Sequence, residues 1–206
     1  MTHTLILSYV TFIYFISFIF YLFKMILQKD IWGRLASFAA WFGFLAHTLA
    51  FVLRWKVSHD MGFGHAPLTN LYESLIFFAW SIAFLYLAVE WRIKNKSLGV
   101  FVVPVAFLIM AYASIAPGMN TRIEPLIPAL QSNWLTTHVL TCFLGYAAFT
   151  VAFGCGLLFL WKDKTQSKSS PVKYAFSQKL PSTAMLDALI YQSAALGFVF
   201  LAIGII

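Results

Sequence analysis

Long apolar segments dominate this sequence and limit what the chain can fold into. Six of them alternate with short polar stretches, at residues 5–27, 35–55, 71–91, 98–116, 134–161 and 185–206. A bilayer core of about 30 Å needs roughly 20 apolar residues for each helical span. Because 61% of the residues are hydrophobic and only 10% are charged, an ordinary soluble domain is excluded. The sequence therefore predicts an all-α, polytopic helical membrane protein, with about six transmembrane helices in a single bundle over residues 1–206.

The positive charges lie in clusters between the apolar segments. Eleven Lys and Arg residues follow the first, third and fifth segments: Lys24, Lys29, Arg34, Arg92, Lys94, Lys96, Lys162, Lys164, Lys168, Lys173 and Lys179. The other side has three, which are Arg54, Lys56 and Arg122. Since loops rich in Lys and Arg stay on the cytoplasmic side, we expect the first set to face the cytoplasm or stroma and both chain ends to face outward. The formal charge of +7 is thus explained by topology, and no nucleic-acid partner is expected.

The two cysteines, Cys142 and Cys155, lie in one apolar segment. Thirteen helical residues separate them by about 20 Å, which is too far for a disulfide. The sequence has no Cys-x-x-Cys pattern, so we expect this chain neither to exchange disulfides nor to carry covalently attached haem. Both thiols are interpreted as buried packing residues.

The start of the third apolar segment carries a helix-initiation signal. Pro67 restricts the residue before it to extended conformations, and Asn70 precedes Glu73 by three residues, as in a capping box. A helix is therefore predicted to begin near Leu71. A carboxylate one turn into an apolar helix is costly unless it is capped, paired or interfacial. One interpretation is that Glu73 only caps its own helix.

Three stretches resemble one family of membrane proteins. Gly-His-x-Pro-Leu-x-Asn-Leu-Tyr-Glu-Ser-Leu from Gly64, followed by Phe-x-x-Trp80, resembles the CcsA/ResC-type cytochrome c assembly proteins. Trp134, followed four residues later by His138 and then by valine, resembles a second segment of that family. The last apolar segment resembles the one ahead of the family's tryptophan-rich haem motif, but the motif itself does not occur in this sequence. The resemblance thus covers the family's N-terminal portion and implies a fragment or a short form.

The resemblance implies a System II role in cytochrome c biogenesis, with haem as the bound substrate. It implies that His138 is an external axial ligand to the haem iron. The capping pattern makes Asn70 and Glu73 structural residues, and the place of Trp134 at the end of a span makes it a structural, interfacial tryptophan. A ResB-type protein and apocytochrome c are the implied partners, in a bacterial plasma membrane or a plastid thylakoid, with His138 on the outer side. The intact family acts as a cytochrome c synthase (haem lyase), and without the tryptophan-rich motif this chain is expected to be inactive alone.

The histidines keep alternative interpretations. His138 could instead be an interfacial residue bonded to a backbone carbonyl. His47 lies deep in the second segment, where an ionisable residue is a functional candidate, although a neutral ring bonded to a neighbouring helix would serve as well. His65 could ligate haem or bond the turn ahead of Asn70. We expect His3 and His59 to be solvated.

Two other function classes compete with this one. The chain could be a non-catalytic membrane scaffold of a haem-assembly complex. A small-solute transporter has less support, because transporters usually contain internal repeats and none is evident here. No His-x3-His or metalloprotease pattern occurs, so a zinc hydrolase is not expected.

Overall fold

The computed structural model describes residues 2–125, 132–167 and 180–206, and in these ranges all regular structure is helical. The helices are α1 (Thr2–Leu27), α2 (Asp30–Asp60), α3 (Leu71–Ile93), α4 (Gly99–Ile115), α5 (Asn133–Ser167) and α7 (Thr183–Ile205). All except α4 are long and apolar enough to cross a membrane, and α4 has 17 residues. The predicted fold class, a polytopic helical membrane protein, is confirmed.

The helices extend beyond the apolar segments that predicted them. The 31 residues of α2 overrun the expected span 35–55 at both ends. The 35 residues of α5 form one helix about 52 Å long. The length of the fifth apolar segment predicted an interfacial turn at its start, and the polar stretch from Lys162 to Pro181 predicted a loop. Both predictions are wrong for the described residues, because α5 is helical from Asn133 to Ser167. Hydropathy finds only the apolar window, whereas Lys and Gln in the polar flank are good helix formers. Residues 168–179, which belong to the same polar stretch, lie outside the described ranges, as do residues 126–131.

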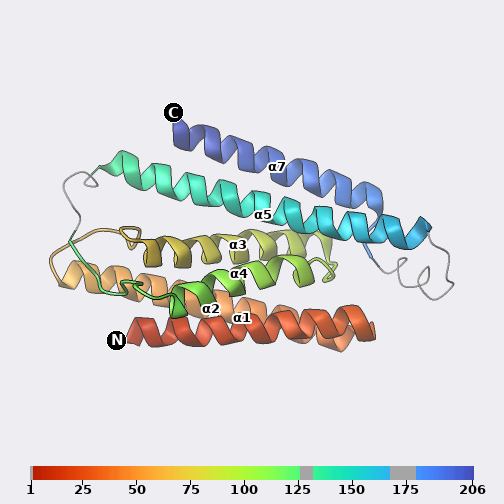
Figure 1. The fold of residues 1–206 in the computed structure, drawn as a ribbon, viewed down its shortest axis with the longest axis horizontal. Coiled ribbons are helices and arrows are strands. Elements are labelled where there is room, and N and C mark those ends of the chain that lie inside the picture. The colour runs from red at the N-terminus through yellow and green to blue at the C-terminus, as the bar shows by residue number, and fades with distance from the viewer. Residues whose placement is uncertain (1, 126–131, 168–179) are drawn as a thin grey trace.

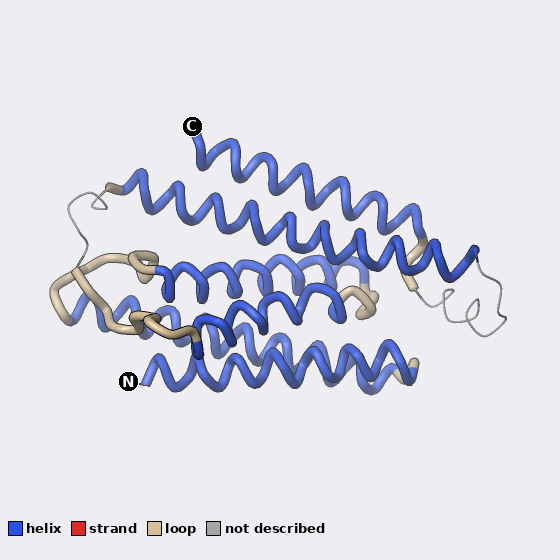
Figure 2. The backbone as a smooth tube through the Cα atoms, in the orientation of Figure 1, coloured by secondary structure: helices blue, strands red, loops and turns tan. Residues whose placement is uncertain are grey.

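Successive helices run in opposite directions along the long axis (Figure 1). The N-terminus, the α2–α3 and α4–α5 connections and the C-terminus lie at one end, which we call the His138 end because His138 lies near the start of α5. The α1–α2 and α3–α4 connections, the end of α5 and the start of α7 lie at the other end, which we call the basic end (Figure 2). Among the described residues, eight of the positive charges lie toward the basic end and three toward the His138 end, the separation that the sequence predicted.

Helix packing separates a core of five helices from one peripheral helix, α7. Helices α1 to α4 pack together with α5 around a shared core, which includes Tyr14, Ile82 and Met110. Helix α7 packs mainly on α5 (Figure 1). Large apolar side chains point outward, such as Phe38 with 72% and Phe198 with 70% of the side chain exposed. In a bilayer these surfaces contact lipid, so the exposure is expected of a membrane bundle.

Candidate functional site

The helix-initiation signal at the His138 end forms as predicted, with one difference. The Asn70 side-chain oxygen accepts the Glu73 backbone N–H at 2.9 Å, and α3 begins at Leu71. In a capping box the Glu73 carboxylate would return to the backbone of Asn70. Instead its Oε2 accepts from the Thr69 N–H at 2.8 Å and the Thr69 hydroxyl at 2.7 Å. The carboxylate therefore orders the residue before the cap.

The other carboxylate oxygen of Glu73 forms a buried ion pair. Arg54, in α2, donates to Oε1 from Nε and from Nη2, each at 2.8 Å, and both side chains are completely buried. A buried ion needs such a partner because desolvation costs several kcal/mol per charge. Glu73 thus does more than cap its own helix, since it also joins α3 to α2.

The remaining donors of Arg54 hold the segment that follows α4. Nη1 donates to the Thr121 carbonyl at 2.9 Å, and Nη2 donates to the Arg122 carbonyl at 3.1 Å. The guanidinium carbon also lies 5.3 Å from the centre of the Tyr72 ring, a cation–π contact. From the sequence, Arg54 was predicted only to be one of three positive charges on the outer side. The available signal was an arginine at the end of one apolar segment and a glutamate at the start of the next.

His65 takes part in the same arrangement. Its Nδ1 lies 3.1 Å from the Ala66 carbonyl and its Nε2 lies 2.9 Å from the Glu124 carbonyl. The contact with Ala66 is the expected bond to the turn ahead of Asn70. Since carbonyl oxygens only accept, a neutral ring satisfies one of the two contacts as a donor. Either nitrogen could reach a metal only after losing its present contact.

His138 lies one turn into α5 and contacts the end of α7. Its Nδ1 is 2.6 Å from the Gly204 carbonyl, and its Nε2 is 3.9 Å from the Cys142 sulfur. The carbonyl can only accept, so Nδ1 carries the proton and the neutral ring has its lone pair on Nε2. A carbonyl bond is what the interfacial interpretation expected. Metal-ligating histidines are oriented by the same kind of bond, so this geometry is compatible with both interpretations.

His47 is completely enclosed between helices. Its Nδ1 lies 3.2 Å from the Tyr14 hydroxyl in α1. Its Nε2 is buried and has no hydrogen-bond partner among the described residues. This arrangement is the one expected for a neutral ring bonded to a neighbouring helix.

His3 and His59 have different environments. His59 is exposed, as predicted. The expectation that His3 is solvated is wrong: only 8% of it is exposed, and it lies within reach of the charges of Arg54 and Glu73. The first turn of α1 is covered because α1 lies along α2.

A second buried carboxylate, Glu90, occupies the basic end. Its Oε1 accepts from the Ser37 hydroxyl at 2.5 Å, and its Oε2 accepts from the hydroxyls of Tyr21 and Tyr86, with Tyr21 at 2.6 Å. These bonds join α1, α2 and α3. Glu90 was not predicted as a site residue, because it lies one residue from the end of the predicted span 71–91, where a charged side chain needs no special explanation.

Two further predictions concern Trp134 and the cysteines. Trp134, in the first turn of α5, is 53% exposed, as expected for an interfacial tryptophan. Cys142 and Cys155 are buried and unpaired, as predicted. In the described part of the chain, no three or more His, Cys, Asp and Glu residues form a group that could hold a metal ion.

Comparison with known proteins identifies the family. The model of the family described as "Cytochrome C assembly protein" matches residues 68–206, which is more than half of the chain. The chain belongs to this family. The match includes the capped start of α3, His138 and the α5–α7 hairpin, so the resemblance seen in the sequence is confirmed.

Three similar proteins carry the name cytochrome c biogenesis protein CcsA. The one from Chlamydomonas reinhardtii is 40% identical over 77% of this chain and 43% of its own length. The one from Trieres chinensis is 37% identical over 77% of this chain and 58% of its own length. The one from Prochlorococcus marinus (strain MIT 9313) is 34% identical over 79% of this chain and 57% of its own length. The chain therefore spans about half the length of these relatives.

Proposed function

We propose that this chain acts in cytochrome c biogenesis, as the N-terminal portion of a protein that delivers haem to the outer membrane face and attaches it to apocytochrome c. Family membership and the CcsA relatives support the process. A ResB-type protein would present the apocytochrome. Since the relatives come from algae and a cyanobacterium, a thylakoid or bacterial plasma membrane is the proposed location.

The observation that carries this proposal is the contact between His138 and Gly204. The 2.6 Å bond fixes the Nδ1–H tautomer and leaves the Nε2 lone pair as the ring's available metal ligand. In the proposed role, Nε2 binds the haem iron axially and Gly204 holds the ring in position. The proposal gives His47 and His65 no part in this role. His47 is completely buried between helices, and both ring nitrogens of His65 contact backbone carbonyls.

The charge distribution supports an outward-facing site. His138 lies at the end with three positive charges, and loops rich in Lys and Arg remain on the cytoplasmic side. The Arg54–Glu73 pair would keep the α2–α3 and α4–α5 connections in fixed positions around the site. A fixed outer surface would let the partner proteins approach in one orientation.

The test uses the full-length protein purified from membranes with its haem. We expect His138→Ala to lower the haem content about tenfold or more and to change the absorption spectrum, because loss of a ligand or its support typically costs 10–100-fold in metal affinity. The matched control is His65→Ala, which should retain both haem and spectrum. An unchanged spectrum in a correctly folded His138→Ala protein would show that the ligand assignment is wrong.

A further inference from the structure

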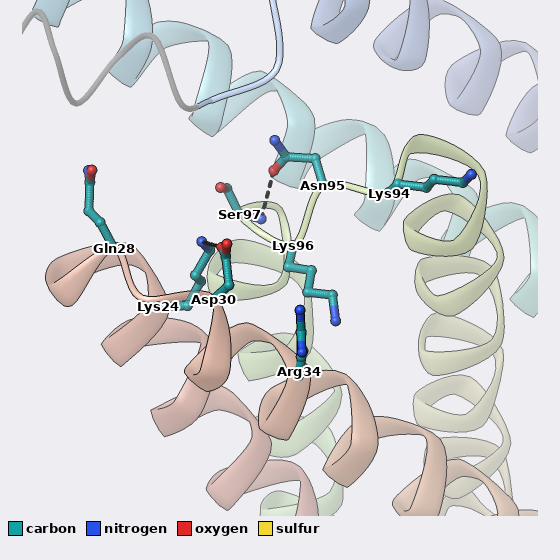
Figure 3. A pocket seen from close by; sticks show the side chains of 8 residues that line it. All are labelled: Lys24, Gln28, Asp30, Arg34, Lys94, Asn95, Lys96 and Ser97. Carbon is teal, nitrogen blue, oxygen red and sulfur yellow. Dashed lines mark hydrogen bonds and ion pairs between the residues drawn. The ribbon is translucent and has the colours of Figure 1, made fainter.

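A basic hollow lies at the basic end, between the α1–α2 and α3–α4 connections (Figure 3). Its volume is about 520 Å³. Lys24, Arg34, Lys94 and Lys96 line it, and Asp30 is its one acidic residue. The hollow is therefore strongly positive, and neither the family match nor the His138 site accounts for it.

Most of this positive charge is unpaired. Lys24 forms an ion pair with Asp30 at 2.5 Å. Among residues that the structure describes, Arg34 and Lys96 have no acidic partner. Figure 3 shows these two side chains extending into the same part of the hollow, while Lys94 points away from it. An anion placed between Arg34 and Lys96 would relieve the repulsion of two like charges.

The backbone around the hollow also favours the binding of an anion. A Cβ on Gly33 would lie 3.0 Å from Cδ of Lys96 and 3.3 Å from Cδ of Lys24, so both lysine stems pack where α2 has no side chain. The N-termini of α2 and α4 also lie at this end, and neither has a side-chain cap. Helix N-termini carry partial positive charge and free N–H groups, which favour phosphate.

The surroundings indicate a lipid as the source of the anion. The hollow lies at the ends of the spans, where a bilayer places its headgroups. Ile26 and Ile31, on the neighbouring turns of α1 and α2, are 63% and 55% exposed, and Leu35 continues this apolar surface along α2. A small soluble anion has no apolar part that could cover this surface. Acyl chains would cover it.

We propose that the hollow binds the phosphate group of an anionic phospholipid, with Arg34 and Lys96 as its main contacts. The acyl chains lie along Ile31 and Leu35. This site is independent of haem handling, and its test does not depend on that function.

The experiment measures lipid retention by the purified, delipidated chain with native mass spectrometry. Phosphatidylglycerol and phosphatidylcholine with the same acyl chains are the probes. We expect the unmodified chain to retain phosphatidylglycerol preferentially. The double variant Arg34→Gln, Lys96→Gln should bind it about 30-fold more weakly, roughly fivefold for each cation. The control, Lys56→Gln with Arg122→Gln, removes the same charge from the His138 end and should bind as the unmodified chain does.

Three results would overturn the proposal: equal binding of the two lipids, an unchanged double variant, or the same loss in the control. Displacement of phosphatidylglycerol by millimolar inorganic phosphate would identify a soluble anion as the ligand and would also overturn it. The charge-conserving variant Arg34→Lys should retain the lipid. If the correctly folded Arg34→Lys variant lost the lipid, a site that binds by charge alone would be contradicted.

Discussion

At the scale of single residues, the buried pair of Arg54 and Glu73 organises the His138 end. The pair connects α2 to α3 and, through the Thr121 and Arg122 carbonyls, holds the segment after α4. Each oxygen of the Glu73 carboxylate has a donor. Removing one charge would leave the other buried without a partner, which costs far more than loss of an exposed ion pair.

We therefore expect Arg54→Ala to destabilise the protein by about 3–5 kcal/mol. The measurement is the free energy of unfolding in mixed detergent–SDS micelles. Lys56→Ala is the matched control, because Lys56 is an exposed cation on the same helix, and its effect should stay within about 0.5 kcal/mol. Similar losses in the two variants would show that burial of the pair contributes little.

The replacement of both partners gives a second comparison. Arg54→Met combined with Glu73→Leu leaves no unpaired buried charge, so we expect it to be more stable than Arg54→Ala. A double variant less stable than Arg54→Ala would show that the bonds from the Glu73 carboxylate to Thr69 contribute more than the unpaired charge costs.

At the scale of elements, glycines set the packing of α5 against α7. A Cβ on Gly145 would lie 3.0 Å from the Gly197 carbonyl, and a Cβ on Gly197 would lie 3.0 Å from the Gly145 carbonyl. Farther along, a Cβ on Gly204 would lie 2.7 Å from the Thr141 hydroxyl. Small residues let helices approach closely in lipid, where packing replaces the hydrophobic driving force. This close approach also brings the Gly204 carbonyl to His138.

Gly197→Val should force α5 and α7 apart. We expect a loss of about 1–3 kcal/mol, typical of overpacking, measured as the free energy of unfolding in micelles. Gly156→Val is the control on α5, because a Cβ at Gly156 would meet nothing within 4 Å. If Gly197→Val were as stable as Gly156→Val, close glycine packing would not hold the hairpin.

At the scale of the whole molecule, the alternating helices separate two chemically different ends. The basic end carries the positive hollow (Figure 3) and also the buried Glu90 carboxylate, which that figure does not draw. The His138 end carries the Arg54–Glu73 pair and His138 itself. The proposals for haem and for lipid therefore apply to opposite membrane faces, and one topology experiment bears on both.

Single cysteines test the orientation in intact cells. In a background of Cys142→Ala and Cys155→Ala, Met61→Cys places a thiol in the α2–α3 connection, where Met61 is 51% exposed. We expect a membrane-impermeant maleimide to label it from outside. Lys29→Cys, in the α1–α2 connection, should react only after the membrane is opened. The reverse result would place His138 inside and contradict its proposed role.

Local features were predictable from the sequence. The start of α3 at Leu71 follows from the Asn70 cap, and the isolation of Cys142 from Cys155 follows from helical spacing. The apolar segments located the helices but not their ends, since the polar flanks of α2 and α5 continue as helix. The burial of His3 was not predicted, because the groups that surround it in space, such as Arg54, are far from it in the sequence.

The sequence by itself determined a membrane bundle, its alternating ends and its family resemblance, because apolar length, charge bias and capping act between residues close in the chain. Only the tertiary structure decided which groups the buried charges meet. Arg54 is 19 residues from Glu73, and Tyr21 is 69 residues from Glu90. No local pattern encodes such distances. Which hydroxyl or guanidinium reaches a buried carboxylate depends on how the helices pack, and in lipid that packing is set by close contacts such as those of Gly145 and Gly197.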